Sequence, residues 1–144
     1  MAKTEVSVAE ALSRAHQALR NDLRKLEESV DPASGQDLIA LCARLAATRS
    51  HITEHFRFEE KNGYMDKVRK REPRLEHTIE QLAAQHRQLA QSLDAIIKRA
   101  KDAASLGPAL REKIREWIAS VRHHEAREDE LVQNAFNLDI GAED

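Results

Sequence analysis

The segment IEQLAAQHRQLAQSLDAI, residues 79–96, decides the fold because its apolar residues recur with the period of a packed helix. They are spaced alternately by three and four positions, so they lie along one face of an α-helix in a bundle. Residue 86, in the middle of that face, is a histidine where a leucine would be expected. An imidazole in an apolar core costs stability unless it finds a polar partner. The face consists of Ile79, Leu82, His86, Leu89, Leu93 and Ile96.

Three other segments carry an apolar face of the same kind, and each of these faces also contains one histidine. In two of them a glutamate follows the histidine by four residues. We therefore predict four core-facing helices. The first has Leu12, His16, Leu19, Leu23 and Leu26 on its face, and the second has Leu41, Leu45, Thr48, Ile52, His55 and Glu59. The last has Leu110, Ile114, Trp117, Val121, His124, Glu128 and Leu131.

Start and stop signals set the expected ends of the first two helices. The first should begin at a capping box, Ser7 to Glu10, and end before Pro32. The second should begin at an N-cap, Ser34, and extend past residue 60 to a break or C-cap at Asn62-Gly63.

The second half of the chain is expected to contain a short basic helix at residues 65–71 and two long helices. One should run from Pro73 to about residue 104, and the other from the break at Gly107-Pro108 to about residue 134. Short connections make successive helices antiparallel, so we predict an all-α, up-down-up-down antiparallel four-helix bundle. Residues 1–144 should form a single domain, with its core at residues 8–134 and a short acidic C-terminal tail.

The four faces are two copies of one pattern. Shifting the first face by 70 residues places it on the third, with His16 on His86. Shifting the second face by 69 residues places it on the fourth, so that the two His-x-x-x-Glu pairs coincide. Each half of the chain is therefore a helical hairpin that contributes one lone histidine and one His-x-x-x-Glu pair.

A His-x-x-x-Glu pair can bind a metal ion because its two side chains lie on the same face of a helix, one turn apart. Four imidazoles and two carboxylates exceed what one ion needs, whereas two ions with shared glutamates use all six groups. A mixed nitrogen and oxygen shell without thiolate suits iron or manganese, with zinc also possible. The metal ligands predicted in the core of the bundle are His16, His55, Glu59, His86, His124 and Glu128.

The same segments resemble a hemerythrin-like, HHE-type cation-binding domain over roughly residues 8–133. The resemblance implies a four-helix bundle around a non-haem di-iron centre, two iron ions joined by an oxo or hydroxo bridge, with manganese or zinc as weaker alternatives. It places His16, His55, Glu59, His86 and His124 at the family's ligand positions. It rests on Ala15-His16-Gln17, His55-Phe56-Arg57-Phe58-Glu59-Glu60, Gln85-His86-Arg87, and the stretch from His123-His124-Glu125 to Glu128-Asp129-Glu130.

Two departures from the oxygen-carrying hemerythrins bear on the function that the resemblance implies. The carriers have a second histidine on the third helix, four residues from the first, where this chain has Leu82 and Ala90. They use His-x-x-x-x-Asp on the last helix; here both Glu128 and Asp129 are available, and the internal repeat favours Glu128. The pattern is similar to the symmetric H-HxxxE-H-HxxxE group, which argues against simple oxygen carriage.

Other candidates near the predicted site have weaker support. His51 lies one turn before His55 on the same face and could replace or support a ligand, but its counterpart under the repeat is Ser120. Tyr64 could place a phenol near the metals, although packing is the default interpretation. We expect Glu60, Glu125 and Glu130 to be solvated or to support the ligands, and His77 and His123 to lie on the surface.

Composition argues against several classes of protein. A formal net charge of -2 and 3% aromatic residues argue against a nucleic-acid surface, and no apolar run approaches the roughly 20 residues of a membrane span. The first residues contain no apolar signal segment, and a single cysteine, Cys42, fits a reducing compartment, so we expect a cytoplasmic protein. Ferritin-type storage would show Glu-x-x-His pairs rather than the His-x-x-x-Glu pairs found here.

The function expected from these features is that of a non-haem di-iron protein that reacts with O2 or peroxide, with catalase-like peroxide scavenging favoured. The alternative is a non-enzymatic module that binds or senses O2, nitric oxide or iron. In both, the partner is a small molecule (O2, H2O2 or NO), and the oligomeric state is left open. A purely structural bundle is a third, weaker interpretation.

Overall fold

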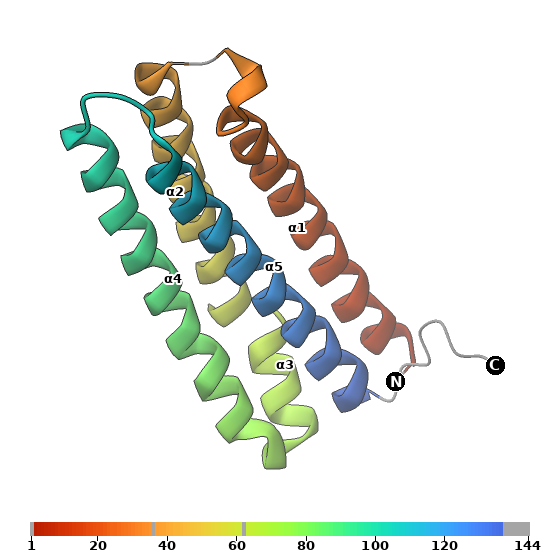
Figure 1. The fold of residues 1–144 in the computed structure, drawn as a ribbon. Coiled ribbons are helices and arrows are strands. Elements are labelled where there is room, and N and C mark those ends of the chain that lie inside the picture. The colour runs from red at the N-terminus through yellow and green to blue at the C-terminus, as the bar shows by residue number, and fades with distance from the viewer. Residues whose placement is uncertain (1, 36, 62, 137–144) are drawn as a thin grey trace.

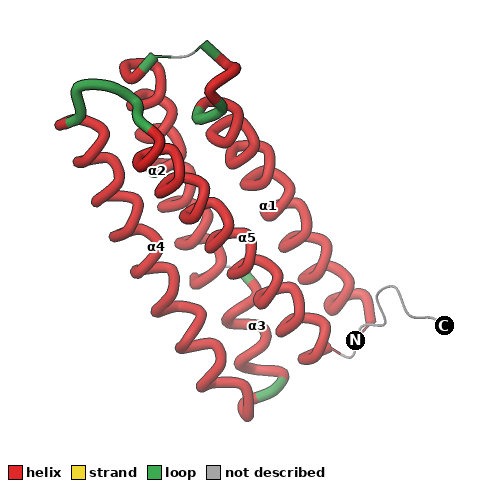
Figure 2. The backbone as a smooth tube through the Cα atoms, viewed as in Figure 1, coloured by secondary structure: helices red, strands yellow, loops and turns green. Residues whose placement is uncertain are grey.

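Four long helices form the body of the structure, a computed structural model that describes residues 2–35, 37–61 and 63–136 (Figure 1). They are α1 (Ala2–Ser29), α2 (Leu38–Lys61), α4 (Glu76–Asp102) and α5 (Pro108–Phe136). A short helix, α3 (Tyr64–Arg71), follows α2, and single 3-10 turns at Pro32–Ser34 and Pro73–Leu75 lie in the connections. Within the described ranges the chain contains only helices, turns and loops (Figure 2).

The long helices run alternately up and down, and each packs against two neighbours (Figure 1). α1 contacts α2 and α5, and α4 contacts the same two helices. The predicted all-α, antiparallel four-helix bundle is therefore confirmed. None of the described helices is long and apolar enough to cross a membrane.

The core consists of the four faces that the sequence predicts, and every residue of those faces is buried. Apolar residues form two clusters, one on each side of the histidines. Leu19 and Ile114 belong to one cluster, and Leu12 and Leu82 to the other. Since burying a leucine contributes roughly 1.5–3 kcal/mol, these clusters stabilise the bundle on both sides of a polar layer.

Three helix starts differ from the sequence prediction. α4 begins at Glu76 rather than at Pro73, because Pro73 lies in the 3-10 turn that precedes the helix. α1 begins at Ala2 rather than at Ser7, because the residues before Ser7 include neither proline nor glycine to stop a helix. Ser34 does not cap α2, since it lies in the preceding 3-10 turn. Asp37 takes that role: its carboxylate accepts a hydrogen bond of 2.9 Å from the Ala40 N–H.

The predicted break after α2 is present and depends on Gly63. A Cβ atom on Gly63 would lie 2.8 Å from the carbonyl oxygen of Phe58 and 2.9 Å from the Cα atom of Glu59. The chain thus turns from α2 into α3 so close to the helix backbone that a side chain at this position would clash with it. The C-cap expected at Asn62 and the acidic tail expected at residues 137–144 lie outside the described residues.

Candidate metal centre

The six predicted ligands converge in one layer of the core, between the two apolar clusters. Each is at most 6% exposed, although imidazoles and carboxylates are rarely buried without partners. All four long helices contribute to the layer. α1 carries His16, α2 carries His55 and Glu59, α4 carries His86, and α5 carries His124 and Glu128.

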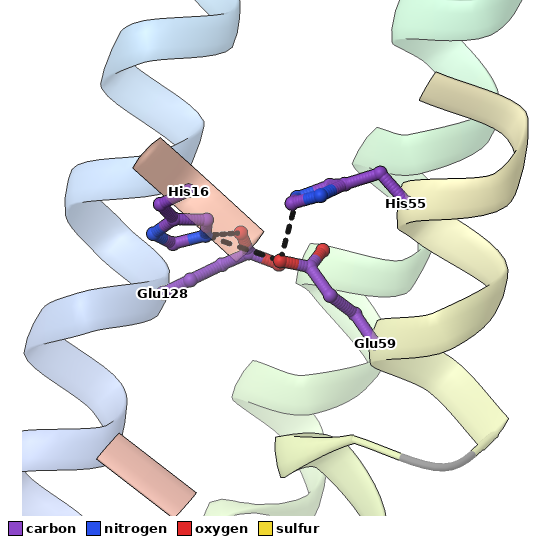
Figure 3. A group of neighbouring side chains, drawn as sticks. All are labelled: His16, His55, Glu59 and Glu128. Atoms are coloured by element: carbon purple, nitrogen blue, oxygen red, sulfur yellow. Dashed lines mark hydrogen bonds and ion pairs between the residues drawn. The ribbon is translucent and has the colours of Figure 1, made fainter. Parts of the chain in front are cut away.

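One group of four side chains is formed by His16, His55, Glu59 and Glu128, which point toward one another in Figure 3. Each offers one ligand atom, and these atoms all lie within 4.8 Å of one another. The Nε2 atom of His16 lies 3.1 Å from Oε2 of Glu59 and 3.0 Å from Oε1 of Glu128. The Nε2 atom of His55 lies 3.0 Å from the same Glu59 oxygen.

A second group combines the same two glutamates with His86 and His124, within the same limit of 4.8 Å. The Nε2 atom of His86 lies 3.1 Å from Oε1 of Glu59 and 3.1 Å from Oε2 of Glu128. The Nε2 atom of His124 lies 3.2 Å from Oε2 of Glu128. Each glutamate therefore presents one oxygen to each group, which is the geometry that two bridging carboxylates require.

The second nitrogen of the two lone histidines also meets an acid. The Nδ1 atom of His16 lies 3.0 Å from a carboxylate oxygen of Asp129, and that of His86 lies 2.6 Å from one of Glu60. Asp129 and Glu60 each directly follow a shared glutamate, so the two contacts are equivalent under the internal repeat. An acceptor at Nδ1 holds the ring with Nε2 free for a metal ion. Asp129 thus lies behind His16, while Glu128 takes part in both groups.

Two further residues hold the layer in place: Gln85, which the sequence did not single out, and Tyr64, which it indicated as a candidate neighbour of the metals. The Oε1 atom of Gln85 accepts a hydrogen bond of 2.7 Å from the Nδ1–H group of His124, and nothing in the spacing of Gln85 distinguishes it from neighbouring glutamines. Tyr64 is buried and donates a hydrogen bond of 2.9 Å from its hydroxyl group to Oε2 of Glu128. Burial and the Glu128 charge raise the pKa of Tyr64, so its phenol stays neutral and remains a donor.

Electrostatics in the layer favour positive charge. Burial by itself would raise the carboxyl pKa values, but contacts with the histidines hold the pKa of Glu59 below its usual range and that of Glu128 well below it. Burial likewise opposes charging of His16, yet its hydrogen bonds to Asp129 and the shared glutamates raise its pKa to about 12. The same carboxylates raise the pKa of His86 to about 10, again against burial. The two glutamates therefore stay ionised and attract cations.

The Hemerythrin HHE cation binding domain matches residues 7–136 of the chain. The chain belongs to this family. Comparison with curated proteins and with solved structures found no significant match. The buried His/Glu groups agree with the HHE pattern of the family, and they are two groups that could hold two metal ions, as is typical of hemerythrin di-iron sites.

The donor atoms fit the metal pair that a hemerythrin domain implies. Among the described residues, the buried Nε2 atoms of His55 and His124 and the Oε1 atom of Glu59 make close ionic contacts but no hydrogen bond. Buried polar atoms without a hydrogen bond destabilise the fold, and here they gather where two ions would bind them. Nitrogen and oxygen donors without thiolate suit iron, manganese or zinc.

Some of the weaker ligand candidates in this hemerythrin domain lie where the sequence predicts, and others do not. His51 belongs to neither group, and its Nδ1 atom lies 3.8 Å from a carboxylate oxygen of Asp22. Glu125 was expected to be solvated or to support a ligand; it is buried, and its Oε2 atom has no hydrogen-bond partner in the described chain. Glu130, His77 and His123 are exposed.

A groove of about 500 Å³ runs beside the layer, between α4 and α5. Its lining includes His124, Ser92 and Ser120. Under the repeat, the two serines correspond to Asp22 and His51, which face each other between α1 and α2. The small serine side chains thus leave a groove between α4 and α5, whereas the larger Asp22 and His51 fill the equivalent space between α1 and α2.

Proposed function

We propose that this hemerythrin domain holds a non-haem di-iron centre that reacts with O2 or peroxide, and that it removes hydrogen peroxide. The observation that carries the proposal is the sharing of Glu59 and Glu128 by two buried groups, with one oxygen of each carboxylate facing each group. We assign His16 and His55 to one ion and His86 and His124 to the other, with the glutamates bridging both. Iron is preferred to manganese or zinc because of the family.

The donor count supports reaction with a small molecule. Each position would have two imidazole nitrogens and two carboxylate oxygens, fewer donors than an octahedral ion takes. When bound, the iron pair supplies the electrons exchanged with peroxide. In the overall reaction one H2O2 is oxidised to O2 and another is reduced to water, so no external reductant is needed.

The chain's own residues would hold the pair, orient the ligands and limit access of water. The apolar clusters shield the layer from both ends of the bundle. The hydroxyl group of Tyr64 fixes the Glu128 carboxylate, and Asp129 and Glu60 fix the two lone histidines. The groove beside His124 is the route we assign to a small uncharged molecule such as H2O2.

A non-enzymatic module that binds or senses O2, nitric oxide or iron is the second candidate. The burial of all six proposed ligands favours it, because a buried site retains a bound gas and slows exchange with solvent. For both functions we place the protein in a reducing cytoplasm, in agreement with its single, unpaired Cys42.

Iron loading and oxygen evolution test the proposal together. The protein is purified without metal, loaded with Fe(II) under anaerobic conditions, and analysed for iron per chain and for near-ultraviolet charge-transfer absorption. We expect about two iron ions per chain and release of O2 on addition of peroxide.

Zinc-loaded protein is the matched control, because zinc fills such sites but has no redox chemistry. It should release no O2. Folded protein that binds no iron would exclude the metal centre, whereas two iron ions without O2 release would favour the binding module over the enzyme.

A further inference from the structure

Glu125 is a buried carboxyl group that the two metal groups do not use. It is 4% exposed, and no described residue donates a hydrogen bond to its Oε2 atom. It lies on α5 midway between Ile118 and Val132, seven residues from each, and both are buried apolar residues. A carboxyl group in such a place is costly unless a cation compensates it.

The charged residues that act on Glu125 are His16 and His55 of one metal group, the shared Glu128, and Arg20. Burial raises its pKa to about 7, while His16 and His55 act to lower it. Arg20 also acts to lower this pKa, but it forms no ion pair with Glu125 in the described chain. No protein cation within the described residues therefore neutralises the Glu125 carboxyl group at contact distance.

The internal repeat shows that this position differs between the two halves. The counterpart of Glu125 is Phe56, 69 residues earlier. The Phe56 ring stacks on the His86 imidazole, with ring centroids 4.0 Å apart and planes 7° apart. An aromatic ring therefore covers the group of His86 and His124, whereas a carboxyl group occupies the equivalent position beside the group of His16 and His55.

We propose that Glu125 is a further metal-binding residue, a third carboxylate for the ion held by His16 and His55. It adds an oxygen donor and a negative charge at that position and none at the other. The pair of metal positions is then unequal despite the repeat of its six main ligands. This inference rests on the proposed metal centre but not on its reaction with peroxide.

Two variant backgrounds separate the positions. His124→Ala leaves only the group of His16 and His55 complete, and His55→Ala leaves only the other. Glu125→Gln should lower the affinity for Fe(II), measured by anaerobic titration calorimetry, by about tenfold or more in the His124→Ala background. In the His55→Ala background it should change the affinity by less than about twofold.

Glu130→Gln is the matched control, since it removes the same charge from an exposed position on the same helix. It should leave both affinities unchanged. Circular dichroism checks that every variant keeps its helix content. An equal effect of Glu125→Gln in both backgrounds, or none in either, would overturn the role of Glu125. Absence of iron from the otherwise native protein would instead overturn the metal centre itself.

A spectroscopic measurement on the complete site covers the case in which the single-group variants bind no iron. In protein loaded with iron-57, Mössbauer spectra should resolve two unequal iron sites, and Glu125→Gln should alter only one of them. Two sites that are identical in the native protein, or equally altered in the variant, would contradict the proposal.

Discussion

Glu59 and Glu128 each contact histidines of both groups, so the two metal positions depend on the same pair of residues. Glu59→Gln or Glu128→Gln keeps the side-chain volume but removes a charge and a bridging oxygen. We expect either substitution to weaken both positions by at least about tenfold, whereas His55→Ala or His124→Ala should empty one. Iron per chain after dialysis against a fixed free iron concentration measures the difference.

His51→Ala is the control for this series. His51 is one turn from His55 but belongs to neither group, so the variant should keep both ions. Loss of an ion from His51→Ala, or native iron content in both glutamine variants, would remove the present assignment of ligands.

Tyr64 is a test of support without ligation. Tyr64→Phe deletes the hydroxyl group that donates to Glu128 and leaves the ring in the core. We expect the free energy of unfolding of the metal-free protein to fall by about 1 kcal/mol, with native iron content after loading. Guanidinium denaturation and metal analysis measure the two quantities. Loss of one iron would show that the phenol is itself a ligand.

At the residue scale, the sequence predicted the groups that interrupt a periodic pattern, and it offered only candidates, such as Glu60 and Tyr64, for the residues that support them. His16 and His86 occupy positions of the apolar repeat where leucines are expected, so the repeat alone identifies them as unusual. Gln85 reaches the layer through the direction of its side chain, for which a one-dimensional pattern carries no signal. Tyr64, already a candidate in the sequence, reaches the layer through the turn after α2. Glu125 was expected to be solvated or to support a ligand, and the structure shows that it is buried.

The α2–α3 junction is the element on which the position of Tyr64 depends. Gly63→Ala would place a methyl group against the backbone of Phe58 and Glu59, which cannot move without distorting α2. We expect a loss of about 1–3 kcal/mol of stability, measured by thermal or denaturant unfolding.

Gly107→Ala is the matched control for this junction. A Cβ atom there would meet nothing within 4 Å, so its effect should stay within about 0.5 kcal/mol. Equal effects of the two substitutions would contradict the close approach at Gly63.

Helix ends were the least predictable elements. Ser7 and Ser34 both have a hydroxyl group that could cap a helix. A serine can act as an N-cap, however, only where the helix begins at that residue. Continuation of α1 back to Ala2 removes the first cap, and the 3-10 turn shifts the second to Asp37. Long periodic interiors, in contrast, were predicted correctly because each face must be buried over many turns.

The seam between α4 and α5 is the element that we expect to control access. Ser120→Trp should fill part of the groove beside His124 and slow peroxide consumption several-fold, with unchanged iron content. Ser50→Trp is the control. Ser50 is exposed on α2 and is the repeat counterpart of Ala119, the neighbour of Ser120, so this variant should consume peroxide at the native rate. Oxygen-electrode traces at matched iron loading compare the two. An unaffected Ser120→Trp would rule out this route.

For the whole molecule, the ligand layer joins all four long helices at the centre of the bundle. Ions that bind only the folded state stabilise it by about 4 kcal/mol at a thousandfold excess over Kd. We therefore expect removal of the metals by a chelator to lower the melting temperature by roughly 10 °C, measured by calorimetry. The metal-free protein should nevertheless keep its helices, because the apolar clusters remain. An unchanged melting temperature would show that the ions do not link the helices.

The net charge of the layer links metal binding to pH. In the metal-free protein the pKa of His16 is about 12 and that of His86 about 10, both above the usual histidine value. Their contribution to stability is therefore complete below about pH 6.5 and is lost as pH rises through about 10 and then 12. At neutral pH both rings carry a proton that neutralises the shared glutamates.

A metal ion needs the deprotonated nitrogen, so it must displace these protons. We expect iron binding at pH 7 to release about two protons per chain, and the affinity to rise with pH, less steeply above the His86 pKa of about 10 and up to the His16 pKa of about 12. Titration calorimetry in buffers of different ionisation enthalpy counts the protons. His51→Ala should release the same number, because His51 lies outside both groups. Binding without proton release would mean that the rings are neutral before the metal arrives, and that the ionised glutamates alone draw the cations into the bundle.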